Sequence, residues 1–279
     1  MTDIDWIINY SLEEDVGDGD HTSLATIPAN ASGKARLLFK QDGILAGIDV
    51  AEKVFKTVNS DIHFQKYKED GNKIKSGETG FIVEGNKISI LTAERLALNF
   101  LQRMSGIATF TNSLVNKLEG LNTRLLDTRK TTPLMRQLEK HAVKMGGGEN
   151  HRMGLYDMVI IKDNHIDFAG GIEQAIKKTQ AYLTTIKKKI KIEIEVRNFE
   201  ELDEVLTIGG IDRIMLDNFS TEELKTAVEK INHRYETEAS GGITENTLRE
   251  YAETGVDFIS VGALTHQIKS LDMSLLATE

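Results

Sequence analysis

The chain has 279 residues, of which 40% are hydrophobic and 28% are charged, and its formal net charge at pH 7 is −9. This length and composition predict a globular protein with one large domain or two smaller ones. The acidic balance argues against a nucleic-acid-binding surface. The absence of cysteine excludes disulfides, a catalytic thiolate and thiolate metal ligands.

The beginning of the sequence has neither the basic segment nor the long apolar segment of a secretory signal peptide. No apolar run reaches the length of about 18 residues that a membrane-spanning helix needs. We therefore expect a cytoplasmic protein that interacts with neither a membrane nor nucleic acid.

The first third of the chain predicts a small α+β domain. Residues 3–14 have helical spacing, and the acidic, glycine-containing segment 14–23 does not match a calcium loop, so we expect it to form an Asx-type turn that caps the next element. Short strands separated by Asp-Gly and Glu-Gly turns, with a helix near 49–58, predict an antiparallel sheet over residues 33–90. A long helix follows over 91–118, with Thr92 as its N-cap and Gly106 as a weak point.

From Leu125 onward, short apolar runs alternate with helical stretches, which is the pattern of parallel βα units. No G-x-G-x-x-G motif follows the first strand, so a dinucleotide-binding Rossmann sheet is disfavoured and a closed or nearly closed α/β barrel fits better. The expected strands lie at 125–126, 159–161, 192–196, 214–216, 236–239 and 258–261.

Polar residues follow nearly every one of these strands. Any single one is readily explained by a salt bridge or a helix cap, but the whole set predicts a site, because the carboxyl ends of parallel strands form the mouth of a barrel. The set consists of Asp127, Arg129, Lys130, Lys162, Asp163, Asn164, His165, Glu193 or Glu195, Asp217, Asn218, Ser240, Gly241, Gly242, Ser260 and Gly262.

The residue types of this set indicate the substrate class. Arginine and lysine, including Arg152, suit carboxylates and phosphates, and the glycines at 241–242 and 262 suit a phosphate held by backbone N–H groups. Glu195 and Asp217 are hard oxygen ligands for magnesium or partners for ribose hydroxyls. Together these groups suggest a sugar-phosphate substrate and a second anionic reactant.

Several long segments closely resemble the quinolinate phosphoribosyltransferase family, and the resemblance extends over essentially the whole chain. The segments are ERLALNFLQRMSGIAT (94–109), TRKTTP (128–133), GGGENHRMGLYDMVIIKDNH (146–165), EIEV (193–196), MLDNF (215–219), ASGGI (239–243) and ISVGALTH (259–266). The GDGDHTS turn near the beginning of the chain fits as well.

The resemblance implies an α/β protein of the type II phosphoribosyltransferase fold. An N-terminal α+β sandwich domain would span residues 1–108, and an incomplete, seven-stranded α/β barrel would span 109–266. The segment 267–279 would pack back on the first domain. The implied reaction joins quinolinate to phosphoribosyl pyrophosphate with Mg²⁺, giving nicotinate mononucleotide, pyrophosphate and carbon dioxide. The implied assembly is a homodimer or hexamer.

The resemblance also implies roles for individual residues. Arg129, His151 and Arg152 would hold the quinolinate carboxylates beside Thr128, and Arg95 would reach in from a neighbouring subunit. Catalysis would fall to Lys130 and Lys162, at phosphoribosyl pyrophosphate and the reacting centre, and to Glu195 and Asp217, at ribose hydroxyls or Mg²⁺. The 5′-phosphate would lie on Ser240, Gly241, Gly242, Ser260, Val261 and Gly262. One departure is Leu134, where the family usually has glycine, and it affects the expected shape of that loop.

The implied chemistry agrees with these residue types. Departure of pyrophosphate builds positive charge on the ribose carbon, and lysines with magnesium stabilise the leaving group. Attack by the pyridine nitrogen makes that nitrogen quaternary, and it then accepts the electrons released when the adjacent carboxylate leaves as carbon dioxide. Decarboxylation therefore needs no further cofactor.

Three alternatives remain. A paralogue found with molybdate transport genes would share the barrel but use another substrate. A catalytically silent barrel would only bind phosphorylated metabolites, although the carboxylates at 195 and 217 with both lysines argue for more than binding. An aldolase would use Lys162 as a Schiff base.

Overall fold

The structure is a computed structural model that describes residues 4–278. The chain forms two compact units, the first made of Met1–Ser113, Thr131–Gly147 and Ala263–Glu279, and the second of Leu114–Lys130 and Gly148–Gly262. The predicted division at residue 108 gives residues 131–147 to the barrel, whereas their contacts are with the first unit. No helix of the described residues is long and apolar enough to cross a membrane.

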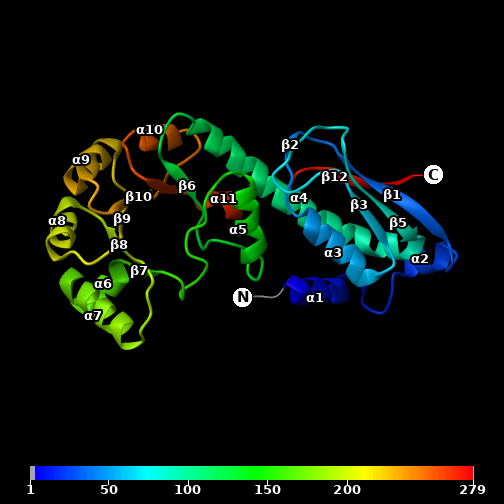
Figure 1. Ribbon diagram of the computed structural model, residues 1–279, viewed down its shortest axis with the longest axis horizontal. Coiled ribbons are helices and arrows are strands. Elements are labelled where there is room, and N and C mark those ends of the chain that lie inside the picture. Colours follow the sequence, from blue (N-terminus) through cyan, green and yellow to red (C-terminus); the bar gives the residue numbers. More distant parts are fainter. Residues whose placement is uncertain (1–3, 279) are drawn as a thin grey trace. The chain divides into compact units, whose positions relative to one another are not determined.

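The first unit is built around a four-stranded antiparallel sheet in the order β12-β1-β5-β3. Its strands are β1 Ser32–Phe39, β3 His63–Lys66, β5 Thr79–Asn86 and β12 Met273–Thr278, and the short strands β2 Gly43–Ile44 and β4 Lys73–Ile74 pair separately. Because β12 pairs with β1, the end of the chain completes a sheet formed by its beginning (Figure 1). The antiparallel sheet predicted for residues 33–90 is confirmed.

The helices of the first unit are α1 Ile4–Val16, α2 His21–Thr26, α3 Ile48–Val58, α4 Lys87–Lys117, α5 Arg136–Met145 and α11 Ala263–His266. The predicted Asx-type cap is present, since Oδ1 of Asp20 accepts the N–H of Ser23 at the start of α2. The predicted N-cap at Thr92 is wrong, because α4 begins at Lys87 and the Thr92 hydroxyl donates to Asp20 instead. Gly106 does not interrupt α4; a side chain there would overlap the carbonyl oxygen of Lys269, so glycine allows a close approach of two backbones.

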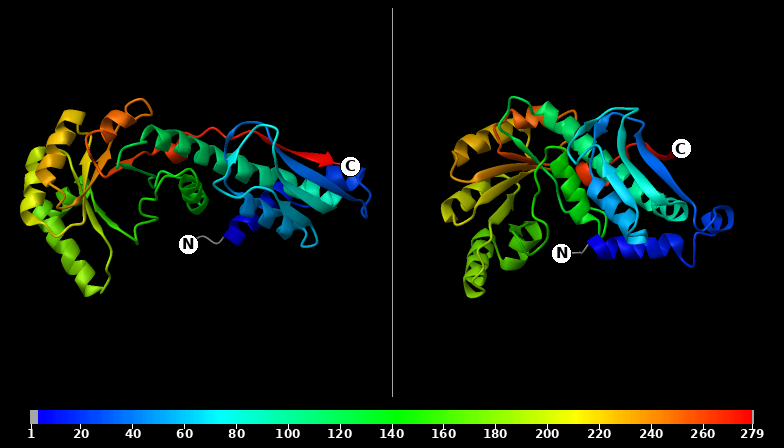
Figure 2. Two further views of the ribbon diagram at one scale, coloured as in Figure 1. Left: turned by 45° about the horizontal axis from the view of Figure 1, so that its top comes forward. Right: turned by 45° about the vertical axis from the view of Figure 1, so that its right-hand side comes forward.

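The second unit contains a parallel sheet of six strands in the order β6-β11-β10-β9-β8-β7. The helices lie on the outer side of the strands (Figures 1 and 2). The strands are β6 Arg124–Leu126, β7 Val159–Ile161, β8 Ile192–Val196, β9 Arg213–Asp217, β10 Glu236–Ser240 and β11 Phe258–Ser260. The helices are α6 Asp163–Ala169, α7 Ile172–Thr185, α8 Phe199–Ile208, α9 Thr221–Ile231 and α10 Leu248–Ala252.

The segment around Glu149 lies next to β6, whereas the seventh strand that the resemblance implies was not placed in the sequence. Glu149 forms a single parallel bridge with Leu126, in which its N–H donates to Leu125 at 2.8 Å and its carbonyl accepts from Asp127 at 3.1 Å. Among the described residues the sheet therefore has six regular strands and one bridging segment. This segment leads directly into His151.

The strand register places charged side chains inside the curved sheet in layers. Glu193 on β8 is level with Arg213 on β9, which is level with Glu236 on β10. Side chains two residues apart on a strand point to the same side, so Glu195 and Glu238 form the next layer toward the carboxyl ends. The interior of this sheet thus contains charged side chains beside apolar ones such as Met215, unlike the largely apolar filling of many α/β barrels.

Candidate functional site

Lys162 and Glu195 form a close charge pair at the carboxyl end of the sheet. Residues 161 and 194 are partners in the parallel register, so the next step along each strand places Lys162 beside Glu195. Their side chains meet at 2.6 Å between Nζ and Oε2. Glu195 is 9% exposed, whereas 46% of the Lys162 side chain is exposed. The lysine therefore faces outward from the sheet end, held by a carboxylate below it.

Asp217 lies at the end of the next strand and adds a second carboxylate. Burial, and then the charge of Glu195, raise the pKa of Asp217, while Lys162 acts against this shift. Asn218 adopts a left-handed conformation with φ of 58° and donates from Nδ2 to Asp217 at 2.6 Å. The two carboxylates thus repel each other close to Lys162, and a bound cation would relieve that repulsion.

The Ser240-Gly241-Gly242 turn packs against Asn218. The carbonyl oxygen of Ser240 accepts the backbone N–H of Asn218 at 2.8 Å. Gly241 has φ of +99° and Gly242 has φ of +64°, and a Cβ atom on residue 241 would overlap the side chain of Asn218. The turn therefore requires glycine at 241 on two grounds, conformation and space.

The basic residues Arg129 and Lys130 follow β6, and both are exposed. The N–H of Lys130 donates to the hydroxyl of Thr128 at 3.0 Å, which shapes this turn. Arg152 is half-buried and donates to the carbonyl of Met158 at 3.0 Å. Burial, and then the charge of Arg129, lower the pKa of Arg152, so the two guanidinium groups interact electrostatically.

Arg152 also lines a cavity of about 330 Å³ beside β7, together with His165 and Lys178. Apolar side chains of β7, including Ile160, form another part of its wall. A cavity with basic and apolar lining suits a small anion that carries a flat apolar ring.

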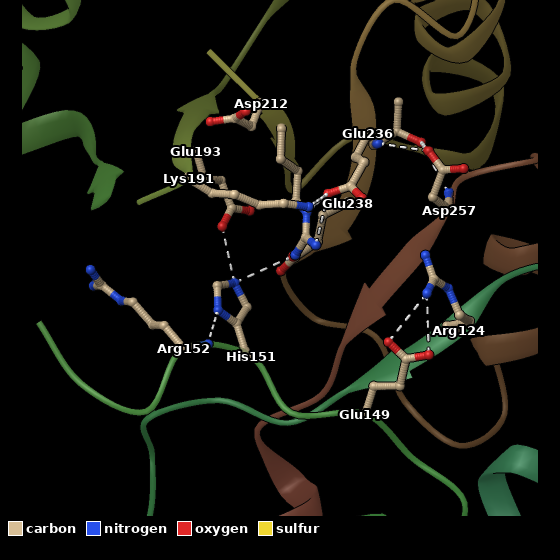
Figure 3. A network of polar contacts seen from close by, with 12 residues as sticks. Arg124, Glu149, His151, Arg152, Lys191, Glu193, Asp212, Glu236, Glu238 and Asp257 are labelled. Atoms are coloured by element: carbon tan, nitrogen blue, oxygen red, sulfur yellow. Dashed lines mark hydrogen bonds and ion pairs between the residues drawn. The ribbon is translucent and has the colours of Figure 1, made fainter. Parts of the chain in front are cut away.

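His151 lies deeper in the sheet, beneath the strand ends, and is 8% exposed (Figure 3). Its Nε2 atom is 3.1 Å from Oε2 of Glu193 and 3.4 Å from Oε2 of Glu238. Its Nδ1 atom accepts the backbone N–H of Arg152 at 2.6 Å. Both ring nitrogens therefore face protein groups, which differs from the predicted role of His151 as a direct carboxylate ligand.

The protonation of this group follows from the same contacts. Burial lowers the pKa of His151, but hydrogen bonding and charge from Glu193 and Glu238 outweigh it and raise this pKa to about 9. Burial, and then the charge of Glu238, raise the pKa of Glu193 to about 7. The hydrogen bond in which Nδ1 accepts the N–H of Arg152 belongs to the neutral ring, in which the proton is on Nε2, and this form is the main one above the pKa of about 9.

Two sets of oxygen and nitrogen atoms could hold a metal ion. Glu195 and Asp217 offer hard carboxylate oxygens at the open end of the sheet, and their mutual repulsion fits a site for magnesium. His151, Glu193 and Glu238 offer ligand atoms within 4.8 Å of one another. Arg213 already donates to Glu238 at 3.0 Å, so we interpret the second set as a buried ion-pair network.

The second unit contains the following predicted site residues, on the strands of one sheet or in the segments that follow them: 128–130, 151–152, 162, 195, 217, 240–242 and 260–262. Arg95 is exposed on α4 in the first unit. Arg213 and Glu238 were missed by sequence reasoning, and Glu193 was considered only as an alternative to Glu195. The available signal was charged residues two or four positions apart in three strands, IEIEV, RIMLD and ETEAS, a spacing that puts them on one side of each strand.

Two family models match consecutive parts of the chain. Residues 20–105 match the family model of the quinolinate phosphoribosyl transferase N-terminal domain, and residues 107–276 match the model of the C-terminal domain. A tobacco (Nicotiana tabacum) protein named quinolinate phosphoribosyltransferase [decarboxylating] 2b, mitochondrial, is 46% identical over 98% of this chain and 82% of its own. A probable nicotinate-nucleotide pyrophosphorylase [carboxylating] of Bacillus subtilis is 40% identical over 98% of this chain and 92% of its own.

Two solved structures of related proteins are similar to this chain over nearly its whole length. The crystal structure of NadC from Streptococcus pyogenes has a TM-score of 0.93 and 38% identity, covering 99% of this chain and 97% of that one. The nicotinate-nucleotide pyrophosphorylase from Francisella tularensis has a TM-score of 0.93 and 40% identity, covering 99% and 96%.

The expectation of a cytoplasmic protein is corrected by these relatives. The name of the tobacco protein places that protein in the mitochondrion, and a rice relative 44% identical to this chain is named chloroplastic. The same domains thus work in different compartments, so composition and the lack of an apolar segment do not indicate the location.

Proposed function

The chain belongs to the quinolinate phosphoribosyltransferase family, and we propose that the carboxyl ends of its parallel strands form the site of the family's reaction. That reaction transfers phosphoribose from phosphoribosyl pyrophosphate to quinolinate with loss of carbon dioxide, and it yields nicotinate mononucleotide for NAD biosynthesis. The enzyme is a pentosyltransferase. The observation that carries the placement is the contact of Lys162 with Glu195 at 2.6 Å, beside Asp217.

Arg129 and Arg152 are the proposed ligands of the two quinolinate carboxylates, with Thr128 shaping the turn that carries Arg129. A guanidinium group can bind a carboxylate through two parallel hydrogen bonds, and two such groups suit a dianion. Their mutual repulsion, reflected in the lowered pKa of Arg152, supports this role because a bound dianion would remove it.

Lys130 and Lys162 would face phosphoribosyl pyrophosphate, and Glu195 and Asp217 would hold ribose hydroxyls or magnesium. Magnesium, when bound, would neutralise charge on the pyrophosphate. Lys162 can place a positive charge near the leaving group because Glu195 fixes its position, and the two carboxylates can stabilise positive charge developing on the ribose carbon. The turns at 240–242 and 260–262 would bind the 5′-phosphate through backbone N–H groups.

The direct test is detection by mass spectrometry of nicotinate mononucleotide after incubation of the purified protein with quinolinate, phosphoribosyl pyrophosphate and Mg²⁺. Nicotinate in place of quinolinate distinguishes a paralogue with another substrate, since nicotinate has one carboxylate and would give the same mononucleotide without release of carbon dioxide. Binding of quinolinate without product formation would support a silent barrel and contradict the proposal.

We also propose a homodimer or larger homo-oligomer in which Arg95 reaches the site of a neighbouring subunit. Exposure of Arg95 on α4 supports this arrangement. Arg95→Ala and Arg152→Ala proteins, each inactive alone, should regain part of the activity when mixed, because one site of a mixed assembly then has both arginines. Mixed assemblies that form but stay inactive would contradict a shared site.

A further inference from the structure

The buried network beneath the strand ends connects four charged or titratable side chains that the reaction does not use directly. Glu193 and Glu238 are fully buried, and Arg213 and His151 are 7% and 8% exposed (Figure 3). Arg213 donates to Glu238 at 3.0 Å and to Glu236 at 3.1 Å. Charged groups at this depth are unfavourable unless they are paired, so their retention inside the sheet calls for a reason beyond stability.

The ring of His151 contacts the network through one nitrogen and the backbone of Arg152 through the other. Nε2 of His151 faces the two glutamates, and Nδ1 accepts the N–H of Arg152 at 2.6 Å. A ring that carried its proton on Nδ1 would oppose the Arg152 N–H instead of binding it. The glutamates therefore select the tautomer of His151 that can bind the backbone of the next residue.

A second contact holds the same pair of residues. Oδ1 of Asp127, a fully buried residue directly after β6, accepts the backbone N–H of His151 at 2.9 Å. Consecutive N–H groups at 151 and 152 are thus both bound, while the side chain of Arg152 extends away from the ring (Figure 3). Fixing this backbone limits the positions that the Arg152 guanidinium can reach.

We propose that Glu193 and Glu238 are positioning residues that act through His151: they hold its ring with Nε2–H facing inward and Nδ1 as acceptor, and so fix Arg152 for binding the anionic substrate. Arg213 is the countercharge that keeps Glu238 in place. This inference rests on the proposed function for the identity of the anion, quinolinate, but the state of His151 can be measured without turnover.

The first measurement is ¹⁵N NMR of the histidine rings in the full-length wild-type protein, with the His151 signals assigned from a His151→Gln variant. The spectrum is recorded above pH 9, where the ring is neutral, and the expected result is a His151 ring with a protonated Nε2 and an unprotonated Nδ1. A neutral ring with its proton on Nδ1 would overturn the proposal, whether or not the enzyme turns over quinolinate. This measurement needs no network variant and so does not depend on whether such a variant folds.

The second measurement compares Glu238→Gln and Glu193→Gln with the control Glu236→Gln. Glu236 forms ion pairs with the same Arg213 and with Lys191, whereas the ion-pair partners of His151 are Glu193 and Glu238. We expect both network variants to shift the His151 ¹⁵N signals and to raise KM for quinolinate by roughly tenfold, the factor for one lost hydrogen bond to a charged group. KM for phosphoribosyl pyrophosphate should change less than about twofold, and the control should change neither value.

The two network variants also separate positioning from a general structural role. Loss of kcat with both KM values unchanged, or an equal rise of both KM values, would overturn the proposal. Unchanged His151 signals in both network variants would overturn it as well. If the protein does not turn over quinolinate at all, the NMR result still decides the role of the glutamates, while the assignment of the substrate fails separately.

Discussion

Nζ of Lys162 lies 2.6 Å from Oε2 of Glu195, one step beyond the paired residues of β7 and β8. The parallel register thus produces a fixed cation at the open end of the sheet. We expect Lys162→Met to lower kcat/KM for phosphoribosyl pyrophosphate by about 10²–10³-fold, as for loss of a group that stabilises developing charge. Steady-state kinetics test this, with Lys177→Met on the surface of α7 as control. A loss below about threefold would show that Lys162 does not act in the reaction.

The Gly241 turn predicts a selective effect on phosphate binding. Gly241→Ala would place a methyl group against Asn218 at φ of +99°, so the turn must change shape. A conformational penalty of about 1–2 kcal/mol corresponds to a rise in KM for phosphoribosyl pyrophosphate of roughly tenfold. Gly120→Ala is the control, because Gly120 also has positive φ, +85°, with no atom within 4 Å of the added Cβ. Equal kinetic effects in both variants would contradict a phosphate-binding role for the turn.

Leu134, the departure from the family pattern, has a backbone conformation that favours glycine. The N–H of Met135 donates to the carbonyl of Thr132 at 3.1 Å, so Pro133 and Leu134 are the central residues of a turn, and Leu134 has φ of 66°. Glycine is favoured at this position. Leu134→Gly should therefore raise the free energy of unfolding by up to about 1 kcal/mol, the left-handed penalty less the greater entropy of the unfolded glycine.

Chemical denaturation tests this prediction for Leu134. The control is Leu155→Gly, another exposed leucine, which has no positive φ and should gain nothing. Destabilisation by Leu134→Gly would indicate that the leucine side chain has contacts worth more than the strain.

The pair of Asp70 and His141 predicts a pH-dependent stability of the first unit. Burial would raise the pKa of Asp70, but hydrogen bonds from His141, at 2.8 Å, and from the backbone N–H groups of Gly47 and Ile48 outweigh it and hold this pKa below its ordinary value of 3.8. A carboxyl whose pKa is lower in the folded state stabilises the fold at pH values above its pKa in the unfolded chain. This contribution is lost as the pH falls through its pKa in the folded state.

Asp70→Asn should therefore lower the free energy of unfolding by about 2 kcal/mol at pH 7. The difference from wild type should shrink as the pH falls below 3.8. Urea unfolding at several pH values measures this difference, and Asp61→Asn at an exposed position is the control. A difference that stays constant down to the acid limit of the folded state would contradict the assigned role of the Asp70 carboxylate.

Periodicity predicted most of the second unit correctly, because its strands are short, apolar and separated by amphipathic helices. The strands at 159–161 and 192–196 have the predicted bounds, the strand predicted at 214–216 is one residue longer at each end, and the other three differ by one residue at one end. Helix α5 was not predicted, since the basic residues of 127–165 were interpreted as site residues only. The segment at Glu149 makes one bridge and carries no strand pattern, so the expected seventh strand could not be located from sequence.

The sequence predicted which site residues lie close together only for residues that directly follow paired strands. Lys162, Glu195 and Asp217 follow apolar runs, and parallel pairing brings them together. The inward network of Glu193, Arg213 and Glu238 depends on register between strands, which no single strand reveals. His151 lies in a loop, and its residue type alone suggested a ligand for an anion. In the structure both of its ring nitrogens contact protein groups instead.

Arg152 gives the most direct test of the claim that basic residues at the strand ends hold a doubly negative pyridine. The measurement is kcat/KM for quinolinate in Arg152→Met, with Arg249→Met on the outer helix α10 as control. The proposed site predicts that kcat/KM falls at least about hundredfold in Arg152→Met, because a desolvated anion loses a charged hydrogen-bonding partner. In the control, kcat/KM should change by less than about twofold. Equal values of kcat/KM in wild type and Arg152→Met would contradict the proposed site.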